Sequence, residues 1–414
     1  MTIGKYSLGA GDRFGKEGAA QVAAFEKIKA DGVDVDIVWN KSNREHTIIG
    51  TSPVDQRKAA DAAVAKTGWK GQYFVDADHI NMTNADWFID SCDFFTIDIT
   101  DLIGKQTTAE NAAAFLERAK PLLGEHTIAG LDAPVVVTEE VLNKIAQRYL
   151  FGLEDAKRLY DRIVEKCGDI RHVELAMDES PERQGPADLL VVLSEVAHEQ
   201  LPIDTVAVKF VGRFNKGVDY VGDVDEFLAE FRADVAVIQY AIKKYGLHEN
   251  LKLSVHTGSD KFSIYPGMGQ IIRELNTGLH LKTAGTTWLE ELIGLAEGGG
   301  EGLAIAKEIY RTAYGMLDEL TAPYADVIDI DPAALPSPDE VDAWTGKQFA
   351  DALRHDQSNP AYNLNLRQLL HVSFKLAAKM GQRYLDALDE HREHVERNVT
   401  ENLYERHLKP LFEA

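Results

Sequence analysis

Short segments rich in apolar and β-branched residues alternate along the chain with longer amphipathic stretches. Segments of this length are typical of buried strands, and the stretches between them are typical of helices. Eight such segments can be counted, at residues 6–8, 35–39, 72–75, 94–99, 172–177, 205–210, 251–255 and 279–282. This alternation predicts a parallel sheet, and eight strands predict an α/β fold of the TIM (β/α)8 barrel type.

Two regions depart from the barrel rhythm. About 70 residues of helical pattern separate the fourth and fifth strands, far more than an ordinary connection. After the eighth strand come a glycine-rich turn, a proline-punctuated acidic segment and long helical stretches at 365–380 and 384–398. We predict a barrel over residues 1–320 with a helical insertion at about 105–168, followed by a helical C-terminal extension over 321–414 that packs on the barrel.

Charge and cysteine content narrow the class of protein. Lys and Arg total 44 against 67 Asp and Glu, a formal net charge of −23, and such a field repels nucleic acids and anionic membranes. Cys92 and Cys167 cannot form a disulfide framework, the N-terminal residues lack the order of a signal peptide, and no apolar run is long enough to span a membrane. We expect a cytoplasmic protein with a small-molecule partner, and the sequence leaves a homo-oligomer open.

Acidic side chains are concentrated where the third, fourth and fifth strands end. In a barrel of this type the catalytic groups lie at the carboxyl ends of the strands. The acidic residues at these three strand ends are Asp76, Asp78, Asp98, Asp101, Glu174, Asp178 and Glu179. Glu174, Asp178 and Glu179 among them are candidates for metal ligands, for acid–base groups, or for partners of Lys209 and Arg213 in a structural ion-pair network.

Histidines and basic side chains mark other strand ends. His79 follows the third strand, His256 ends the seventh, and His280 shares a strand face with Lys282 in the eighth. Three imidazoles suit Zn²⁺ or another first-row divalent cation such as Mn²⁺ or Ni²⁺, and they leave a position open for substrate oxygens. The alternative is that each ring is a hydrogen-bonded histidine of the core or surface.

Two further segments leave alternatives open. Residues 258–261 (GSDK) have the composition of an anion-binding loop and equally that of a plain turn. Arg367 and His371 lie one helical turn apart, so they face the same way. They either cap the barrel mouth or, as we favour, pack the helix onto the barrel.

Motifs along nearly the whole chain resemble the tagaturonate/fructuronate epimerase family. The resemblance is carried by residues 76–79 (DADH), 92–99 (CDFFTIDI), 177–179 (MDE), 210–223 (FVGRFNKGVDYVGD), 254–265 (SVHTGSDKFSIY), 280–290 (HLKTAGTTWLE), 367–372 (RQLLHV) and 398–408 (NVTENLYERHL). The segment around Arg213 departs from the AlaProArgPhe pattern of the family, which leaves the substrate preference open. The resemblance implies an epimerase that interconverts D-tagaturonate and D-fructuronate.

The resemblance also implies roles for individual residues. His79, His256 and His280 match the metal positions, Asp78 matches a proton acceptor, and Glu179, rather than Glu174, matches the proton donor. The two ketoses differ at the carbon β to the ketone, whose proton the ketone does not acidify. We therefore expect a metal-assisted retro-aldol cleavage followed by recombination.

The substrate carboxylate then needs a cationic contact, and rival functions remain open. Lys209, Arg213 or Lys282 would hold the carboxylate, and Asp178 is a further substrate contact. A metal-dependent aldolase would use the same residues and release the fragments instead of recombining them. A non-catalytic sugar-acid binding protein is an alternative from another class, and it would need no metal.

Overall fold

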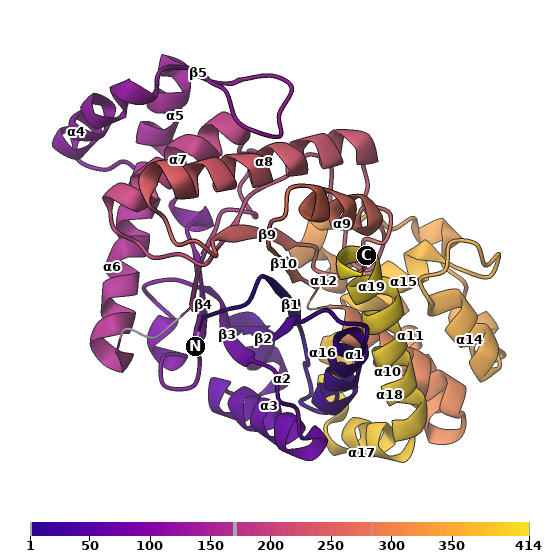
Figure 1. Ribbon diagram of the computed structural model, residues 1–414. Coiled ribbons are helices and arrows are strands. Elements are labelled where there is room, and N and C mark those ends of the chain that lie inside the picture. The colour runs from indigo at the N-terminus through magenta and orange to yellow at the C-terminus, as the bar shows by residue number, and fades with distance from the viewer. Residues whose placement is uncertain (1, 169–171, 284, 414) are drawn as a thin grey trace.

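Eight parallel strands close into a barrel at the centre of the molecule (Figure 1). The computed structural model describes residues 2–168, 172–283 and 285–413. The barrel strands are β1 (Tyr6–Ala10), β2 (Asp36–Ser42), β3 (Tyr73–Ile80), β4 (Phe94–Asp98), β7 (His172–Ala176), β8 (Thr205–Ala207), β9 (Lys252–His256) and β10 (Leu279–Lys282). Their order around the barrel is β1-β10-β9-β8-β7-β4-β3-β2, which confirms the predicted fold class.

The register of the strands brings their carboxyl ends to one rim. Pairing of Gly9 with Lys282 joins the first strand to the last and closes the barrel, and Lys282 in turn pairs with His256. The ladder between β3 and β4 shifts register between Ala77 and Ile80, and His79 there has a positive φ of 52°. This β-bulge bends β3 at the rim and re-aims the side chains that follow it.

Helices cover the outside of the barrel and connect successive strands. They are α1 (Gly18–Ala30), α2 (Asn43–Ile49), α3 (Pro53–Thr67), α6 (Leu150–Cys167), α7 (Pro186–His198), α8 (Val224–Tyr245), α9 (Tyr265–Glu274) and α10 (Thr286–Gly298). Local chemistry sets their starts: Ser52 and Asp55 form a capping box before α3, and Asp12 accepts the backbone N–H groups of Glu17 and Gly18 ahead of α1. Short 3₁₀ turns occupy Ala85–Trp87 and Thr100–Leu102.

The insertion between β4 and β7 contains a small hairpin that the helical pattern does not reveal. It comprises α4 (Ala109–Ala119), a 3₁₀ turn (Lys120–Leu122), the antiparallel strands β5 (Gly124–His126) and β6 (Val135–Val137), and α5 (Glu139–Arg148). In Figure 1 this unit lies above α7 and α8, and α5 and β6 pack against α7. The following helix, α6, packs beside β4 as an ordinary barrel helix does, although it falls within the range expected for the insertion.

The C-terminal extension is a layer of short helices packed against α10 and α1. It follows α11 (Gly300–Gly315) and α12 (Leu317–Thr321). Its elements are two 3₁₀ segments (Ala322–Val327 and Pro332–Ala334), α13 (Pro338–Asp342), α14 (Gly346–Leu353), α15 (Leu364–His371), α16 (Phe374–Met380), α17 (Gln382–Glu390), α18 (Arg392–Glu401), a π-helix (Asn402–Leu408) and α19 (Lys409–Phe412). Each long helix expected here is broken, at Val372–Ser373 and at His391. The extension returns to the start of the chain, where the Phe412 ring lies 4.9 Å from the Tyr6 ring.

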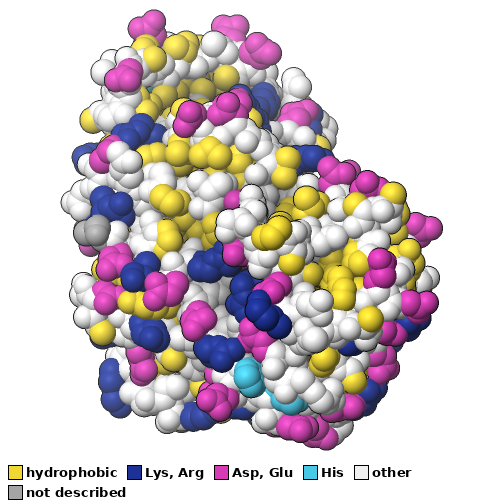
Figure 2. All heavy atoms as spheres, turned by 90° about the vertical axis from the view of Figure 1, so that its right-hand side faces the viewer, with side chains coloured by type: hydrophobic (Ala, Val, Ile, Leu, Met, Phe, Trp, Pro, Cys, Tyr) yellow, Lys and Arg dark blue, Asp and Glu magenta, His cyan; other side chains and the backbone are white. Residues whose placement is uncertain are grey.

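The surface carries both signs of charge. Figure 2 views the side on which the helices of the extension lie, and it shows Lys and Arg side chains gathered toward the middle among scattered acidic ones. Within the described residues, every helix is too short or too polar to cross a bilayer.

The contact between the two ends of the chain gives a test of the fold. We expect Phe412→Ala to lower the free energy of unfolding by about 3–5 kcal/mol, because Phe412 is only 3% exposed and its removal leaves a cavity against Tyr6. Urea unfolding followed by circular dichroism measures the change. The matched control is Leu364→Ala in the same extension, where the side chain is 47% exposed and the expected change is within about 0.5 kcal/mol. Equal losses in the two variants would contradict the packing described.

Candidate active site

A buried lysine at the end of β10 is surrounded by three carboxylates from other strands. Lys282 Nζ lies 2.8 Å from Asp76 Oδ2, 2.8 Å from Asp78 Oδ1 and 3.0 Å from Glu174 Oε1. Burial disfavours the charged form of each group, but the three carboxylates raise the pKa of Lys282 well above its usual value. Burial likewise opposes ionisation of Glu174, yet Lys282 and His256 hold its pKa well below the usual range.

The bulge in β3 turns two consecutive side chains toward the mouth. Neighbouring residues of a regular strand point to opposite faces, so Asp78 and His79 could not both face inward without it. Asp78 accepts a hydrogen bond from Lys282, while His79 Nδ1 lies 2.8 Å from Asp98 Oδ2 at the end of β4. His79 Nε2 lies 3.9 Å from Asp78 Oδ1, so the two remain neighbours.

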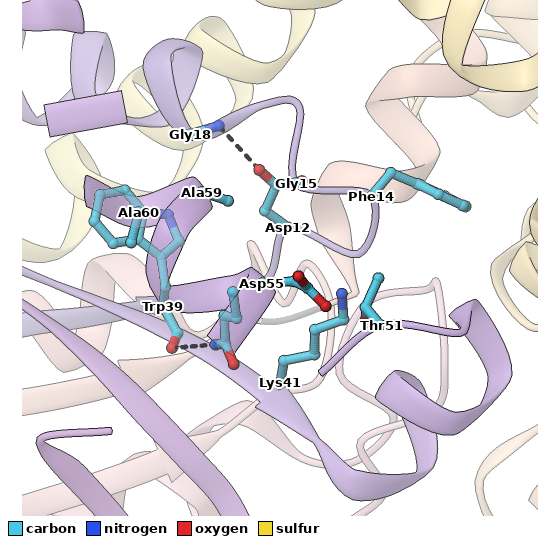
Figure 3. A pocket seen from close by; sticks show the side chains of 11 residues that line it. Asp12, Phe14, Gly15, Gly18, Trp39, Lys41, Thr51, Asp55, Ala59 and Ala60 are labelled. Atoms are coloured by element: carbon cyan, nitrogen blue, oxygen red, sulfur yellow. Dashed lines mark hydrogen bonds between the residues drawn. The ribbon is translucent and has the colours of Figure 1, made fainter. Parts of the chain in front are cut away.

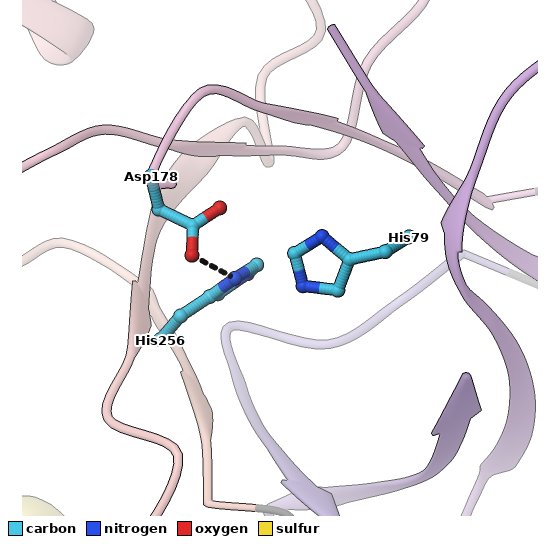
Figure 4. A group of neighbouring side chains, drawn as sticks. All are labelled: His79, Asp178 and His256. Carbon is cyan, nitrogen blue, oxygen red and sulfur yellow. Dashed lines mark ion pairs between the residues drawn. The ribbon is translucent and has the colours of Figure 1, made fainter. Parts of the chain in front are cut away.

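His256 at the end of β9 lies between two acidic groups from β7 and the turn beyond it. Its Nε2 is 2.7 Å from Glu174 Oε1, and its Nδ1 is 2.9 Å from Asp178 Oδ2. Although burial favours the neutral ring, Asp178 and Glu174 raise the pKa of His256 to about 9. Figure 4 shows that His79 faces His256 and Asp178. The centroids of the two imidazole rings are 5.3 Å apart.

The nitrogen and oxygen atoms of His79, Asp178 and His256 are close enough to bind one cation. One ligand atom from each lies within 4.8 Å of the other two. Asp178 Oδ1 and His256 Nδ1 are both buried without a hydrogen-bond partner among the described atoms, although 2.9 Å separates His256 Nδ1 from Asp178 Oδ2. Two imidazoles and a carboxylate are a donor set that suits Zn²⁺ and related divalent cations, so these residues fit a metal.

His280 does not join the other two imidazoles. Both His280 and Lys282 face the barrel interior, but His280 pairs with Ser254, one layer below the rim where Lys282 pairs with His256. Its Nδ1 lies 2.8 Å from Ser7 Oγ, and burial lowers the pKa of the ring to about 3. In the described residues Asp178, rather than His280, completes the cluster, which corrects the expectation that three histidines converge.

Glu179 and Glu174 differ in their access to the mouth. Glu179 is exposed in the turn beyond β7, and one of its oxygens can share a cation site with His79 and Asp98. Glu174 is fully buried and is held by both His256 and Lys282. The exposed carboxyl of Glu179 is open to a ligand at the mouth, whereas Glu174 is closed off from the mouth and both its partners are charged groups of the site.

The basic residues expected at the mouth have different surroundings. Lys282 is occupied by its three carboxylates, and Arg213 is 51% exposed, with its guanidinium 3.5 Å from Asp329. The backbone N–H of Lys209 donates to Gln184 Oε1 at 2.8 Å. Thus Lys282 acts as an internal counter-ion, and Arg213 points to the extension.

A pocket of about 150 Å³ lies beside the barrel, not over these residues. It is formed between the loop after β1, the end of β2 and α3, and Figure 3 shows Trp39, Lys41 and Asp55 among the residues that line it. None of the acidic or histidine residues of the cluster lines it. The pocket therefore belongs to the packing of α3 on the barrel.

Comparison with known protein families identifies the chain. The family model described as tagaturonate epimerase matches residues 1–411. The chain belongs to the tagaturonate epimerase family.

Members of the family resemble this chain over most of their length. A tagaturonate/fructuronate epimerase of Thermotoga maritima is 26% identical over 416 residues, covering 95% of this chain and 80% of that protein. Crystal structures of the fructuronate-tagaturonate epimerase of Cohnella laeviribosi are 22% identical and cover 99% of this chain and 82% of theirs. Their TM-scores are 0.82 with glycerol bound and 0.79 in the native form. These structures share the fold.

A second buried network ties this tagaturonate epimerase family member's extension to the loop after β9. Arg367 Nη2 lies 2.6 Å from Asp260 Oδ2, and His355 Nδ1 lies 3.2 Å from the same oxygen. Asp260, Arg367 and His355 are at most 1% exposed. Contacts with the extension therefore fix the loop at residues 258–261 (GSDK). In the sequence, the spacing of Arg367 and His371 indicates only that they lie on one helix face. It does not predict that Arg367 pairs with Asp260.

The Lys282 cluster predicts a pH-dependent loss of stability. Lys282→Met should lower the free energy of unfolding by about 3–5 kcal/mol near pH 8, because Asp76, Asp78 and Glu174 are left buried without their cation. Burial already raises the pKa of Asp76 to about 7, and without Lys282 we expect it to rise further and the pKa values of Asp78 and Glu174 to rise above their unfolded values. Protonation then stabilises the variant as pH falls, and the deficit should shrink near about pH 5.

Urea unfolding at the two pH values checks this expectation. The control is Lys347→Met, whose side chain is 82% exposed and pairs only with Asp351, so a change under about 1 kcal/mol is expected. A Lys282→Met deficit that is the same at both pH values would mean that lost packing, rather than charge, is responsible.

Proposed function

We propose that this protein interconverts D-tagaturonate and D-fructuronate by a metal-dependent retro-aldol cleavage and recombination. Membership of the tagaturonate epimerase family supports the reaction. The observation that carries the mechanism is the convergence of His79, His256 and Asp178 beside Asp78 at the carboxyl ends of the strands. That rim is where enzymes of this fold place their chemistry.

His79, His256 and Asp178 would hold the divalent cation, which is Zn²⁺, Mn²⁺ or Ni²⁺. When bound, the cation supplies Lewis-acid stabilisation of negative charge on substrate oxygens. Asp98 and Glu174 each contact one of the two imidazoles and would orient it. His280 lies too deep in the barrel to be part of this set, and its contact with Ser7 gives it a structural role.

Asp78 would take the proton from the hydroxyl on the carbon that is epimerised. Burial opposes its ionisation, but Lys282 and His79 keep the pKa of Asp78 below its usual value, so the carboxylate is ready to accept a proton. Loss of that proton breaks the bond between this carbon and its neighbour α to the ketone. The products are a three-carbon aldehyde and a three-carbon enediolate.

Epimerisation requires the aldehyde to turn and recombine through its opposite face. Glu179, which is exposed and close to His79 and Asp98, would supply the proton to the new hydroxyl. The reverse reaction exchanges the roles of Asp78 and Glu179, as expected for an enzyme that works in both directions.

Proton NMR of D-tagaturonate with chelator-treated protein tests the reaction. We expect no conversion without metal and formation of D-fructuronate after Zn²⁺, Mn²⁺ or Ni²⁺ is added, because the cation is needed to stabilise the enediolate. Accumulation of three-carbon fragments would instead identify an aldolase. An unchanged spectrum with all three metals would refute the proposed substrate.

Substitution of the two carboxyl groups tests their roles. Asp78→Asn and Glu179→Gln should each lower kcat by about 10²–10⁴-fold, the usual contribution of a general base or acid. The control is Asp101→Asn, an exposed residue at the same rim, which should keep kcat. Thermal unfolding of each variant separates a loss of chemistry from a loss of fold. Full turnover by either variant would remove that residue from the mechanism.

A further inference from the structure

Lys216 places a cation over the barrel mouth without a counter-ion. It stands in the loop after β8, and its Nζ lies 3.4 Å from the position that a Cβ on Gly258 would occupy, two residues beyond His256. Among the residues that the structure describes, no side chain forms an ion pair or hydrogen bond with this ammonium. Burial lowers its pKa, while the charge of Glu179 does most to favour its charged form.

Two further nitrogens beside Lys216 have no partner. Arg13 and His371 are 8% and 4% exposed, and Arg13 Nη1 and His371 Nε2 are buried without a hydrogen bond to any described atom. Arg13 is fixed by Glu45, 2.9 Å from its Nε, and by the Phe374 ring, 4.1 Å from its guanidinium carbon. Both nitrogens are therefore buried without a hydrogen bond. Leaving a buried polar group unsatisfied costs folding free energy unless a ligand supplies the missing partner.

The three groups lie around one place. A Cβ on Gly285 would collide with both His371 Nε2 and the carbonyl oxygen of Gly258, the residue over which the Lys216 ammonium lies. Burial lowers the pKa of His371 well below its usual value, and the charges of Arg13 and Lys216 lower it further. The neutral ring therefore adds no charge of its own to two neighbouring cations.

The loop that carries Lys216 is rigidly attached. The Lys216 backbone N–H donates to the Val327 carbonyl at 2.8 Å, and the Gly217 N–H donates to Ser259 Oγ at 2.9 Å. Arg367 Nε donates to the Gly217 carbonyl at 2.6 Å while the same guanidinium binds Asp260. The extension and the loop after β9 thus fix the backbone from which the Lys216 side chain extends.

The barrel order divides the mouth into two halves. One half follows the adjacent strands β1, β8, β9 and β10 and carries Arg13, Lys216, Gly258 and Gly285. The other half lies at the ends of β3, β4 and β7 and carries Asp78, His79, Asp98 and Asp178. His256 at the end of β9 lies where the halves meet. A molecule that spans the mouth meets acid–base groups and imidazoles at one end. At the other end it meets the Lys216 ammonium and the Nη1 of Arg13 that has no hydrogen-bond partner among the described residues.

We propose that Lys216, with Arg13 and His371 beside it, forms the subsite that binds the carboxylate of the sugar acid, and that this subsite selects a uronate over the corresponding neutral ketose. The inference rests on the proposed function for the identity of the substrate. It assigns the carboxylate contact to Lys216 instead of Lys209, Arg213 or Lys282.

Kinetics of Lys216→Met with an acidic and a neutral substrate tests the subsite. With D-tagaturonate, kcat/KM should fall by about 10- to 100-fold, mainly through KM, because a charge-assisted hydrogen bond is lost. With D-fructose, the neutral counterpart of the epimer D-fructuronate with a hydroxymethyl group in place of the carboxylate, kcat/KM should stay within about threefold. Lys216→Arg should recover part of the activity on the uronate. Lys105→Met, which removes an exposed cation from the loop after β4, should leave both substrates unaffected.

Calorimetry with D-galactonate, a hexonate that cannot react, gives a second readout. Its dissociation constant should rise by about 10- to 100-fold in Lys216→Met. Equal losses on D-tagaturonate and D-fructose, or unchanged D-galactonate binding, would overturn the subsite. If the wild-type protein does not epimerise D-tagaturonate, the proposed function fails, and the calorimetry still decides whether Lys216 binds the carboxylate.

Discussion

The charge of Lys282 is the constraint on which the rest of the barrel interior depends. Three carboxylates from β3 and β7 converge on this one ammonium, and burial of any of them as an anion would otherwise cost several kcal/mol. Because Glu174 remains ionised, it can contact His256, and because Asp78 remains ionised, it stays available beside His79. A single cation thus ties β10 to strands on the opposite side of the barrel and sets the protonation of the groups above it.

Opposite charges are kept apart at the rim by local backbone geometry. The bulge at His79 directs Asp78 and His79 to the part of the mouth above β3, β4 and β7. The extension contacts the loop of Lys216, which follows β8. Arg367 is central to this division because it binds Asp260 in the loop after β9 and the Gly217 carbonyl in the loop after β8. The C-terminal helices therefore shape the mouth without supplying most of the groups that line it.

Periodicity predicts the barrel because each strand is a short apolar run followed by an amphipathic helix, and that pattern needs no tertiary information. It fails for β5 and β6, since three residues are too few to show alternation, and for the breaks at Val372 and His391, where no proline marks the end of a helix. Strand ends correctly place His79 and His256 at the mouth. Alternation shows that His280 and Lys282 share a face, but only the register shows which of them reaches the rim. Lys216 lies in an irregular loop, so no sequence period locates it.

The last helices of the chain complete the outer packing of the first. Arg392 donates to the Lys16 carbonyl at 2.8 Å, Thr400 donates to the Ala20 carbonyl at 2.9 Å, and Tyr404 donates to Asp31 at 2.6 Å. During synthesis α1 leaves the ribosome long before Arg392, Thr400 and Tyr404 are made. The barrel likewise cannot close until β10 has been made and can pair with β1. Contacts between residues so distant in sequence form late and make folding slow. The fold can therefore close only after residues 392–404 have left the ribosome, and until then the surface of α1 that they cover stays exposed.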